Sequence, residues 1–236
     1  VIVALETSEG LVGFGEAPPT ARITGDTQES VIAAIEKHIG PAIMQRKGAN
    51  LNDLLDSVDR AIMGNSSAKA AVDIALHDLW GKTLGRSVHQ LFGGGDKVIV
   101  TDMTISVDKP AVMAADAENA VEKGYQTLKI KVGIDGDLDV ERLLAVRKAI
   151  GDKIQIRIDA NQGWTPGEAV RTLRKMEALG LAIEFCEQPT KADDISGMRF
   201  VRERVAIPIM ADESVHDSKD ALTVLQAGAA DLINIK

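Results

Sequence analysis

Residues 127–132 read Thr127-Leu-Lys-Ile-Lys-Val132, and residues 154–159 read Ile154-Gln-Ile-Arg-Ile-Asp159. Between these two apolar runs lies an amphipathic stretch, residues 137–150, that is long enough for one helix. Short apolar runs that alternate with amphipathic helical stretches indicate βα units and a parallel sheet. This segment therefore predicts an α/β fold.

The same alternation continues on both sides of this unit. Apolar runs occur at residues 98–107, 127–132, 154–159, 183–187, 207–212 and 232–236. Helical stretches occur at residues 110–123, 137–150, 165–179, 194–205 and 218–227. Because a closed barrel of this kind needs about eight strands, we expect a modified TIM-type (β/α) barrel that is truncated after its sixth strand in this chain.

Residues 1–92 have a different texture. Two β-rich runs, 1–7 and 11–16, flank a glycine-containing turn, and three helical patterns follow at residues 30–40, 52–63 and 67–84. The run Gly93-Gly94-Gly95 marks the boundary. We expect an α+β capping domain at residues 1–95, with an N-terminal strand missing before Val1, and a partial barrel domain at residues 96–236.

Composition excludes several classes of protein. The 236 residues are 45% hydrophobic and carry a net charge of −8, without a Lys/Arg-rich block, so we expect a folded protein and no nucleic-acid partner. Its one cysteine, Cys186, can form neither an intramolecular disulfide nor a paired-thiolate metal site, which fits the reducing cytoplasm. No apolar run approaches the ~20 residues of a membrane span, so no membrane partner is expected.

Charged side chains end successive apolar runs, one βα repeat apart. They are Lys129 and Lys131, Asp159, Glu187, Asp212 and Lys236, and Asn161 stands with Asp159 at the end of its run. Active sites of such barrels lie at the C-terminal ends of the strands. The pattern therefore predicts that these groups converge on one rim.

Three carboxylates on adjacent strands form a set of oxygen ligands, which suits Mg²⁺, whereas zinc is disfavoured because no His or Cys ends a strand. Lys129 and Lys131 share a strand face, where mutual repulsion and partial burial are expected to lower an ammonium pKa. A neutral lysine can remove a proton α to a carboxylate, and a second lysine opposite it can return one from the other side. The predicted chemistry is racemisation or epimerisation.

These residues carry a resemblance to a known family. The motifs Lys129-Ile-Lys131, Asp159-Ala-Asn161, Glu187-Gln-Pro189, Asp212-Glu-Ser214 and Asn234-Ile-Lys236 resemble the enolase superfamily, muconate-lactonising subgroup. Within that subgroup the chain is most similar to the dipeptide epimerases, in particular bacterial L-Ala-D/L-Glu epimerases.

The resemblance implies a role for each matching residue. It implies Lys131 and Lys236 as acid/base catalysts, Asp159, Glu187 and Asp212 as Mg²⁺ ligands, Lys129 and Thr104 as substrate contacts, and the 18–26 loop as a cover. The implied protein is an isomerase. It would catalyse Mg²⁺-dependent 1,1-proton transfer at the α-carbon of a dipeptide's C-terminal residue, and the dipeptide would come from peptidoglycan turnover. We also expect a homo-oligomer.

Other interpretations stay open. A muconate-type cycloisomerase, an N-acylamino-acid racemase or an o-succinylbenzoate synthase would use the same lysines and metal, and a non-catalytic binding protein could keep the fold. Trp164 fits either a pocket wall or helix packing. Strand parity and loop position predict Glu213 to be solvent-exposed and Cys186 to fill the core.

Overall fold

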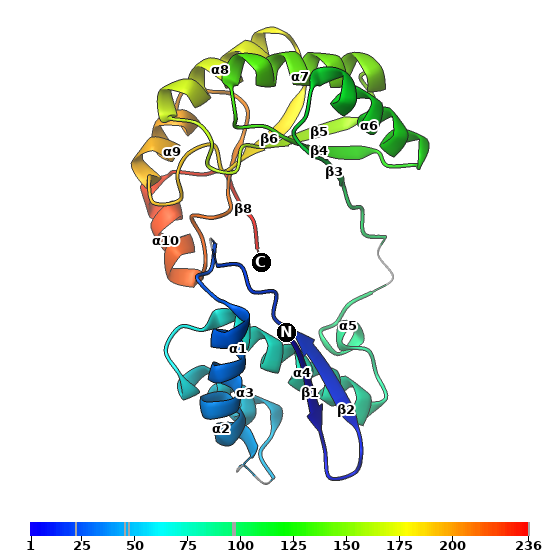
Figure 1. The fold of residues 1–236 in the computed structure, drawn as a ribbon, viewed down its shortest axis with the longest axis vertical. Helices are drawn as coiled ribbons and strands as arrows, with labels where there is room; N and C mark the ends of the chain where they lie inside the picture. Colours follow the sequence, from blue (N-terminus) through cyan, green and yellow to red (C-terminus); the bar gives the residue numbers. More distant parts are fainter. Residues whose placement is uncertain (22, 45, 47, 96–97, 236) are drawn as a thin grey trace. The chain divides into compact units, whose positions relative to one another are not determined.

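The computed structural model describes residues 1–235 except 22, 45, 47, 96 and 97. The chain divides into two compact units, residues 1–98 and 99–236, each of which is described by itself (Figure 1).

The second unit is built on one parallel sheet of six strands. They are β3 (Met103–Ile105), β4 (Thr127–Lys131), β5 (Gln155–Asp159), β6 (Ile183–Glu187), β7 (Ile209–Ala211) and β8 (Leu232–Ile233). They pair in chain order, and each neighbouring pair of strands is parallel. This confirms the predicted α/β class and the sheet of a barrel that is truncated after its sixth strand.

Helices follow the strands and line one face of this sheet (Figure 1). They are α6 (Pro110–Glu122), α7 (Gly136–Ile150), α8 (Pro166–Ala178), α9 (Ile195–Arg202) and α10 (Ser218–Ala227). The core lies between the two layers, where Leu128, Ile130, Ile156 and Ile158 are fully buried. Strand side chains alternate between faces, so the residues between these apolar positions lie on the opposite, concave face.

Polar caps at the helix N-termini fix where each helix begins after its strand. Asp135, Asp194 and Asp217 each accept a backbone N–H of the first turn, of α7, α9 and α10 respectively. Thr165 forms a capping box with Glu168 at the start of α8. These caps satisfy N–H groups that the helix itself leaves unpaired, and so keep the connections from strand to helix short.

The first unit packs a hairpin on a long helix. Strands β1 (Ile2–Glu6) and β2 (Val12–Glu16) are antiparallel and contact α4 (Ser66–Leu84). Gly15 permits this approach, since a Cβ there would lie 1.8 Å from the Ala71 carbonyl oxygen. The other helical segments are α1 (Gln28–Ala34), η1 (Ile35–Ile39), α2 (Gly40–Met44), α3 (Leu51–Ala61) and α5 (Val88–Leu91).

The first predicted helix is longer than its pattern indicates. It continues past Gly40 through a π-helical turn, in which the Gly40 N–H donates to the Ile35 carbonyl. Pro41 has no N–H, and its ring would collide with a carbonyl one α-turn earlier. The wider turn relieves this collision, and the helix proceeds to Met44.

Two apolar runs give shorter strands than expected. The run at 98–107 forms a strand only at Met103–Ile105, and Val98, Ile99 and Val100 are 92%, 86% and 73% exposed. In the described part of the run at 232–236, the strand spans Leu232–Ile233, and the Asn234 N–H adds one more hydrogen bond, to the Ala211 carbonyl at 2.8 Å. Hydrophobicity marks a segment that can be buried in a sheet, but a strand also needs a partner along its whole length.

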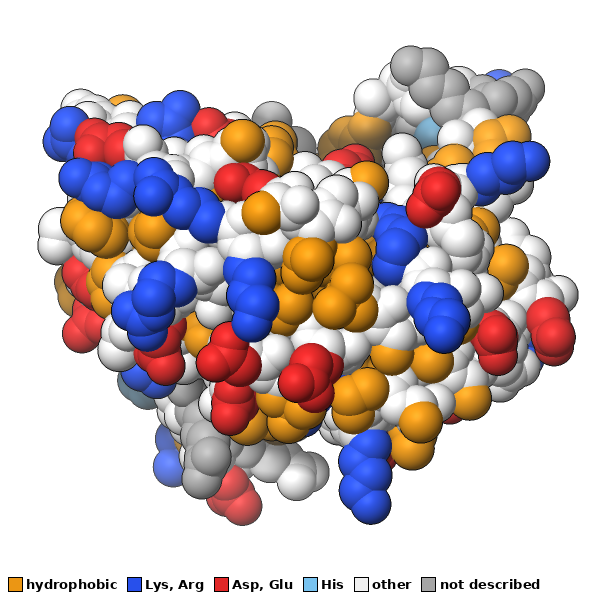
Figure 2. Space-filling model, turned by 90° about the horizontal axis from the view of Figure 1, so that it is seen from above, with side chains coloured by type: hydrophobic (Ala, Val, Ile, Leu, Met, Phe, Trp, Pro, Cys, Tyr) orange, Lys and Arg blue, Asp and Glu red, His pale blue; other side chains and the backbone are white. Residues whose placement is uncertain are grey.

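The surface carries both signs of charge. Figure 2 shows Lys and Arg side chains interspersed with Asp and Glu side chains on the face it draws. Among the described helices, none is long and apolar enough to cross a membrane.

Candidate active site

Strand register brings the predicted side chains into one row on the concave face of the second unit. Lys131 pairs with Asp159, and Asp159 pairs with Glu187 across β4, β5 and β6. Thr104 of β3 pairs with Lys129, two residues before Lys131 on the same side of β4. The sheet therefore brings together Lys129, Lys131, Asp159 and Glu187, which the sequence placed at strand ends, and Thr104, which the resemblance implied as a substrate contact.

Lys129 bridges two buried carboxylates. Its Nζ lies 2.8 Å from Asp159 Oδ2 and 2.8 Å from Glu187 Oε2, and these side chains are 1% and 4% exposed. Burial acts to lower the pKa of Lys129, but its hydrogen bonds and attraction to the two carboxylates outweigh burial and raise that pKa above its ordinary value. The expected lowering is thus wrong for Lys129, because the ammonium meets carboxylates rather than only the neighbouring lysine.

The two carboxylates respond differently to this environment. Burial opposes the charged form of Asp159, but hydrogen bonds from Lys129 and Lys131 lower its pKa below the ordinary range. Burial raises the pKa of Glu187, the Lys129 hydrogen bond opposes this, and the charges of Asp159 and Asp212 raise it further. Around Glu187, the rim therefore holds more negative charge than the nearby ammonium groups neutralise.

Lys131 is the more accessible of the two lysines. Its Nζ lies 2.7 Å from Asp159 Oδ2 and 2.5 Å from Asn161 Oδ1, and its side chain is 28% exposed. Asn161 has the left-handed φ of 42° that asparagine tolerates, and its N–H donates to Asp159 Oδ1 at 2.9 Å. The amine thus lies at the rim between two oxygen acceptors.

Asp212, just after β7, is held by amide groups. Its backbone N–H donates to Oε1 of the fully buried Gln188 at 2.8 Å, and Gln188 Nε2 donates to Ser214 Oγ at 2.7 Å. Asn234 Nδ2 donates to Asp212 Oδ1 at 3.2 Å and to Glu187 Oε1 at 3.3 Å. These contacts place the third carboxylate next to the second.

Buried Asp139 ties together the loops that follow β4 and β5. Its Oδ2 accepts the Gly133 N–H at 2.9 Å and Trp164 Nε1–H at 3.2 Å, and its Oδ1 pairs with Arg142 at 2.8 Å. A Cβ on Gly163 would lie 1.9 Å from the Gly133 carbonyl oxygen, so the two loops are in close contact. Trp164 is 3% exposed, which supports its packing role over the pocket-wall alternative.

The three carboxylates form a donor set that suits a divalent cation. Asp159, Glu187 and Asp212 are 1%, 3% and 5% exposed and supply carboxylate oxygens, the ligands that Mg²⁺ prefers. Among the described residues, no three Asp, Glu, His or Cys side chains are arranged so that they could hold a metal ion as they stand. Lys129 and Asn234 donate hydrogen bonds to oxygens of these carboxylates. The residues fit a cation that takes the place of these donors.

Three further polar side chains lie at the rim, Asn161, Glu213 and Asn234, and the sequence had given none of them a role. Glu213 was expected in solvent, but it is 6% exposed, which corrects that prediction. After Asp212 the backbone turns, so strand parity no longer decides where the next side chain points. Asn161 and Asn234 stand inside the quoted motifs, and the fact that each lies two residues from a strand-end charge was the available signal.

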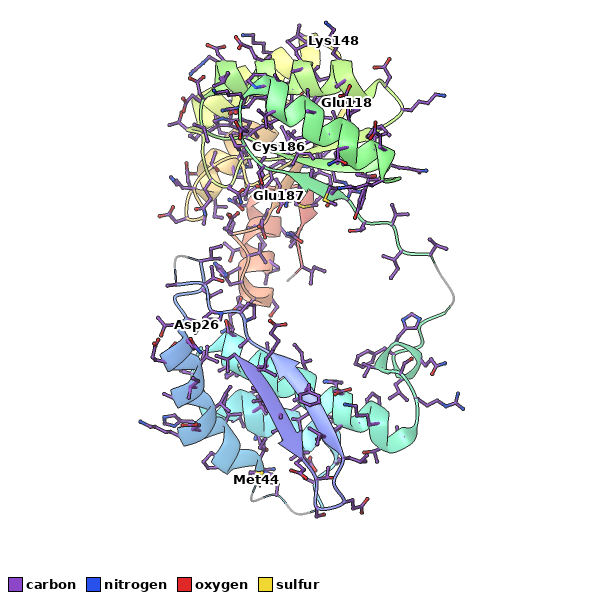
Figure 3. The ribbon with its side chains drawn as sticks, turned by 45° about the vertical axis from the view of Figure 1, so that its right-hand side comes forward. Asp26, Met44, Glu118, Lys148, Cys186 and Glu187 are labelled. Atoms are coloured by element: carbon purple, nitrogen blue, oxygen red, sulfur yellow. The ribbon has the colours of Figure 1, made fainter. Side chains whose placement is uncertain are left out.

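The remaining predicted positions differ in their burial. Cys186 is fully buried among core residues while the adjacent Glu187 lies on the concave side, as alternation requires (Figure 3). Thr104 is exposed. Lys236 lies outside the described residues. In the first unit, Asp26 at the end of the 18–26 loop accepts a hydrogen bond from Ser67 Oγ at 2.5 Å.

Two family models cover nearly the whole chain. Residues 112–236 match the enolase C-terminal domain-like family, and residues 1–93 match the mandelate racemase / muconate lactonizing enzyme N-terminal domain. The chain belongs to the enolase superfamily. Its six parallel strands are accordingly part of the barrel of that superfamily, and the small unit is the N-terminal domain that accompanies it.

Individual members of the superfamily are similar over the full chain. The L-Ala-D/L-Glu epimerase of Clostridium acetobutylicum is 48% identical over 236 residues, which are 100% of this chain and 66% of that protein. The substrate-liganded L-Ala-D/L-Glu epimerase structure from Bacillus subtilis has a TM-score of 0.95 at 47% identity, covering 99% of this chain and 66% of that one.

A further structure is the Enterococcus faecalis dipeptide epimerase complexed with Mg and the dipeptide L-Leu-L-Tyr. It has a TM-score of 0.93 at 42% identity, covering 100% of this chain and 66% of that one. The chain thus spans just under two thirds of the length of the relatives it matches.

Proposed function

We propose that the protein is a Mg²⁺-dependent dipeptide epimerase, which transfers a proton at the α-carbon of the C-terminal residue, with L-Ala-D/L-Glu as substrate. The observation that carries the proposal is the row of charges: the Lys131 amine lies 2.7 Å from Asp159, the first of three buried carboxylates on one rim. Relatives named as L-Ala-D/L-Glu epimerases, 47–48% identical over the full chain, support the choice of substrate.

Two lysines are proposed to move the proton. Lys131 removes or returns the α-proton on one side of the carbon, and Lys236 does so on the other. A proton that leaves toward one amine and is replaced from the other inverts the centre. A general base must lie within hydrogen-bond reach of the proton it takes. The 28% exposed side chain of Lys131, at the rim, supports this role.

The carboxylates and the remaining polar groups are proposed to bind and orient the substrate. Asp159, Glu187 and Asp212 would hold the cation, which when bound stabilises negative charge that develops on the substrate carboxylate. Lys129 and Thr104, side by side on β4 and β3, would contact the substrate. The Lys129 ammonium, which pairs with Asp159 and Glu187 here, would then have the substrate carboxylate as its partner.

The test is proton exchange in deuterated water. The purified protein with MgCl₂ is incubated with L-Ala-L-Glu and L-Ala-D-Glu, and the α-proton of the C-terminal residue is followed by NMR. We expect loss of this signal and appearance of the other diastereomer. A matched control is Lys148→Met, on the exposed face of α7 (Figure 3), which should exchange like wild type, whereas Lys131→Met should not epimerise either dipeptide. Wild-type protein that exchanges no dipeptide refutes the proposal.

The rival reactions of the superfamily are separate arms of the same experiment. The N-succinyl-L-Arg/Lys racemase of Bacillus cereus is 38% identical over the full chain, so N-succinyl-arginine is the sharpest competitor substrate. Muconate tests the cycloisomerase alternative. Faster turnover of either compound than of every dipeptide would move the assignment to that reaction.

The proposal extends to the setting of the enzyme. We propose that it acts in the cytoplasm on dipeptides released during peptidoglycan turnover, and that it forms a homo-oligomer. Light scattering of the purified protein checks the last point, and a monomer at micromolar concentration would contradict it.

A further inference from the structure

Glu213 is a buried carboxylate that the proposed reaction leaves without a role. It lies in the turn after β7, and its side chain is almost wholly enclosed, at 6% exposure of the residue. Oε1 accepts a hydrogen bond from Asn161 Nδ2 at 3.2 Å, whereas Oε2 is buried and has no hydrogen-bond partner among the described residues. A buried polar oxygen without a hydrogen-bond partner is costly, so an apolar side chain here would favour folding more than glutamate does.

The contact of Glu213 decides how the amide of Asn161 is oriented. Asn161 faces the carboxylate of Glu213 on one side and the ammonium of Lys131 on the other, where Oδ1 accepts from Nζ at 2.5 Å. An amide has one accepting and one donating end. Reversing it would direct NH₂ at the ammonium and oxygen at the carboxylate, so Glu213 selects the orientation that presents an acceptor to Lys131.

We propose that Glu213 is a positioning residue that acts through Asn161 to hold the Lys131 amine at the rim. This inference rests on the proposed function for Lys131. In this structure Nζ has two acceptors, Asp159 Oδ2 and Asn161 Oδ1. Asp159 is also a proposed cation ligand, so Asn161 is the one of the two acceptors that stays available to Lys131 when Asp159 binds a metal.

A carboxylate suits this role better than an amide. Both oxygens of Glu213 are acceptors, so Asn161 Nδ2 finds an acceptor whichever oxygen faces it. Glutamine in that place could present either its oxygen or its NH₂ group. We therefore expect Glu213→Gln to keep the Asn161 amide partly in its present orientation. Glu213→Leu, of similar size and without an acceptor, should lose this control of the amide.

The first test is crystallographic and needs no turnover. Structures of the wild-type and Glu213→Leu proteins, both with Mg²⁺, are compared at Asn161 and Lys131. We expect Lys131 Nζ within hydrogen-bond distance of Asn161 Oδ1 in the wild type, and a rotated amide or a displaced amine in Glu213→Leu. If Asn161 and Lys131 are unmoved in the variant, the proposal is overturned.

The second test is a double-mutant cycle on dipeptide exchange. Glu213→Leu and Asn161→Gly, which keeps the left-handed backbone, should each lower kcat about tenfold with KM changed less than twofold. The double variant should be no slower than either single variant, because both remove one chain of contacts. If the decreases in kcat of the two single variants multiply in the double variant, the proposal is overturned. It is also overturned if Glu213→Leu has the kcat of wild type.

Stability and charge controls separate positioning from folding. Glu213→Leu should unfold at the same or higher urea concentration than wild type, because it removes a buried oxygen, Oε2, that has no hydrogen-bond partner among the described residues. Its slower turnover would then not reflect a damaged fold. Glu118→Gln, on the exposed side of α6 (Figure 3), removes a carboxylate with no change in kcat. If wild-type protein exchanges no dipeptide, the proposed function fails, and the crystallographic comparison still decides the role of Glu213.

Discussion

Replacing Lys129 by methionine tests whether its ammonium stands where a cation would bind. The variant keeps the length of the side chain but leaves Asp159 and Glu187, 1% and 4% exposed, without the group 2.8 Å from each. Removing one partner of a buried ion pair costs about 3–5 kcal/mol. Lys131 still neutralises Asp159, and the Lys129 side chain is 19% exposed, so we expect the lower end, about 3 kcal/mol of unfolding free energy without metal.

The same substitution should strengthen metal binding. Lys129 and the cation compete for the same two oxygens, so Lys129→Met is expected to bind Mg²⁺ about tenfold more tightly, which is about 1.4 kcal/mol. Urea unfolding with and without MgCl₂ measures both effects, because a ligand stabilises the folded state by an amount set by its affinity. The stability deficit of the variant should therefore shrink as Mg²⁺ is added.

Lys148→Met, an exposed change on α7, is the control and should stay within about 0.5 kcal/mol of wild type in both conditions. If Lys129→Met loses the same unfolding free energy, relative to wild type, with and without Mg²⁺, the reasoning is refuted. Such a result would mean that the lysine and the cation do not share a site.

Three further predictions concern the two lysines of the proposed proton transfer, the loops and pH. Lys131→Met and Lys236→Met should each retain α-proton exchange on only one of the two dipeptide diastereomers, and the retained diastereomer should differ between the two variants. NMR in deuterated water measures this exchange. If both variants exchanged the same diastereomer, the two-base mechanism would be contradicted. Asp139→Asn leaves Arg142 without its carboxylate 2.8 Å away and should lower the unfolding free energy by about 3 kcal/mol in urea melts; a loss under 1 kcal/mol would show that this network is not what anchors the loops. The pKa of Asp159 is below its ordinary 3.8 in the folded protein, because two lysine hydrogen bonds outweigh burial; its ionised form therefore stabilises the fold above pH 3.8, and this contribution is lost as pH falls through the lower folded-state pKa. Asp159→Asn should flatten the dependence of unfolding free energy on pH below 4, and an unchanged slope would contradict the pairing.

The barrel and its rim were predictable because they follow from short-range rules. Alternating apolar runs and amphipathic stretches indicate parallel βα units, and the carboxyl ends of parallel strands meet at one edge. Lys131, Asp159 and Glu187 could be assigned to one row from their spacing alone, and strand register in the structure places them side by side.

The rest depended on contacts between distant residues. Sequence spacing placed Lys129 beside Lys131 and suggested repulsion, whereas the sheet brings it between two carboxylates from the next strands. The burial of Glu213 follows from a turn after β7 that breaks the two-residue alternation. Neither the shortness of β3 nor the π-helical turn before Pro41 is encoded in hydrophobicity, because each is set by backbone partners.

The bridge made by Lys129 bears on the order of folding and metal loading. Small zinc domains gather their ligands around the ion and stay unfolded without it. Here an internal counter-ion, the ammonium of Lys129, already neutralises charge between Asp159 and Glu187. With the proposed Mg²⁺ site, such a protein folds before the ion binds. A shortage of Mg²⁺ would then leave folded protein that binds the ion when it returns.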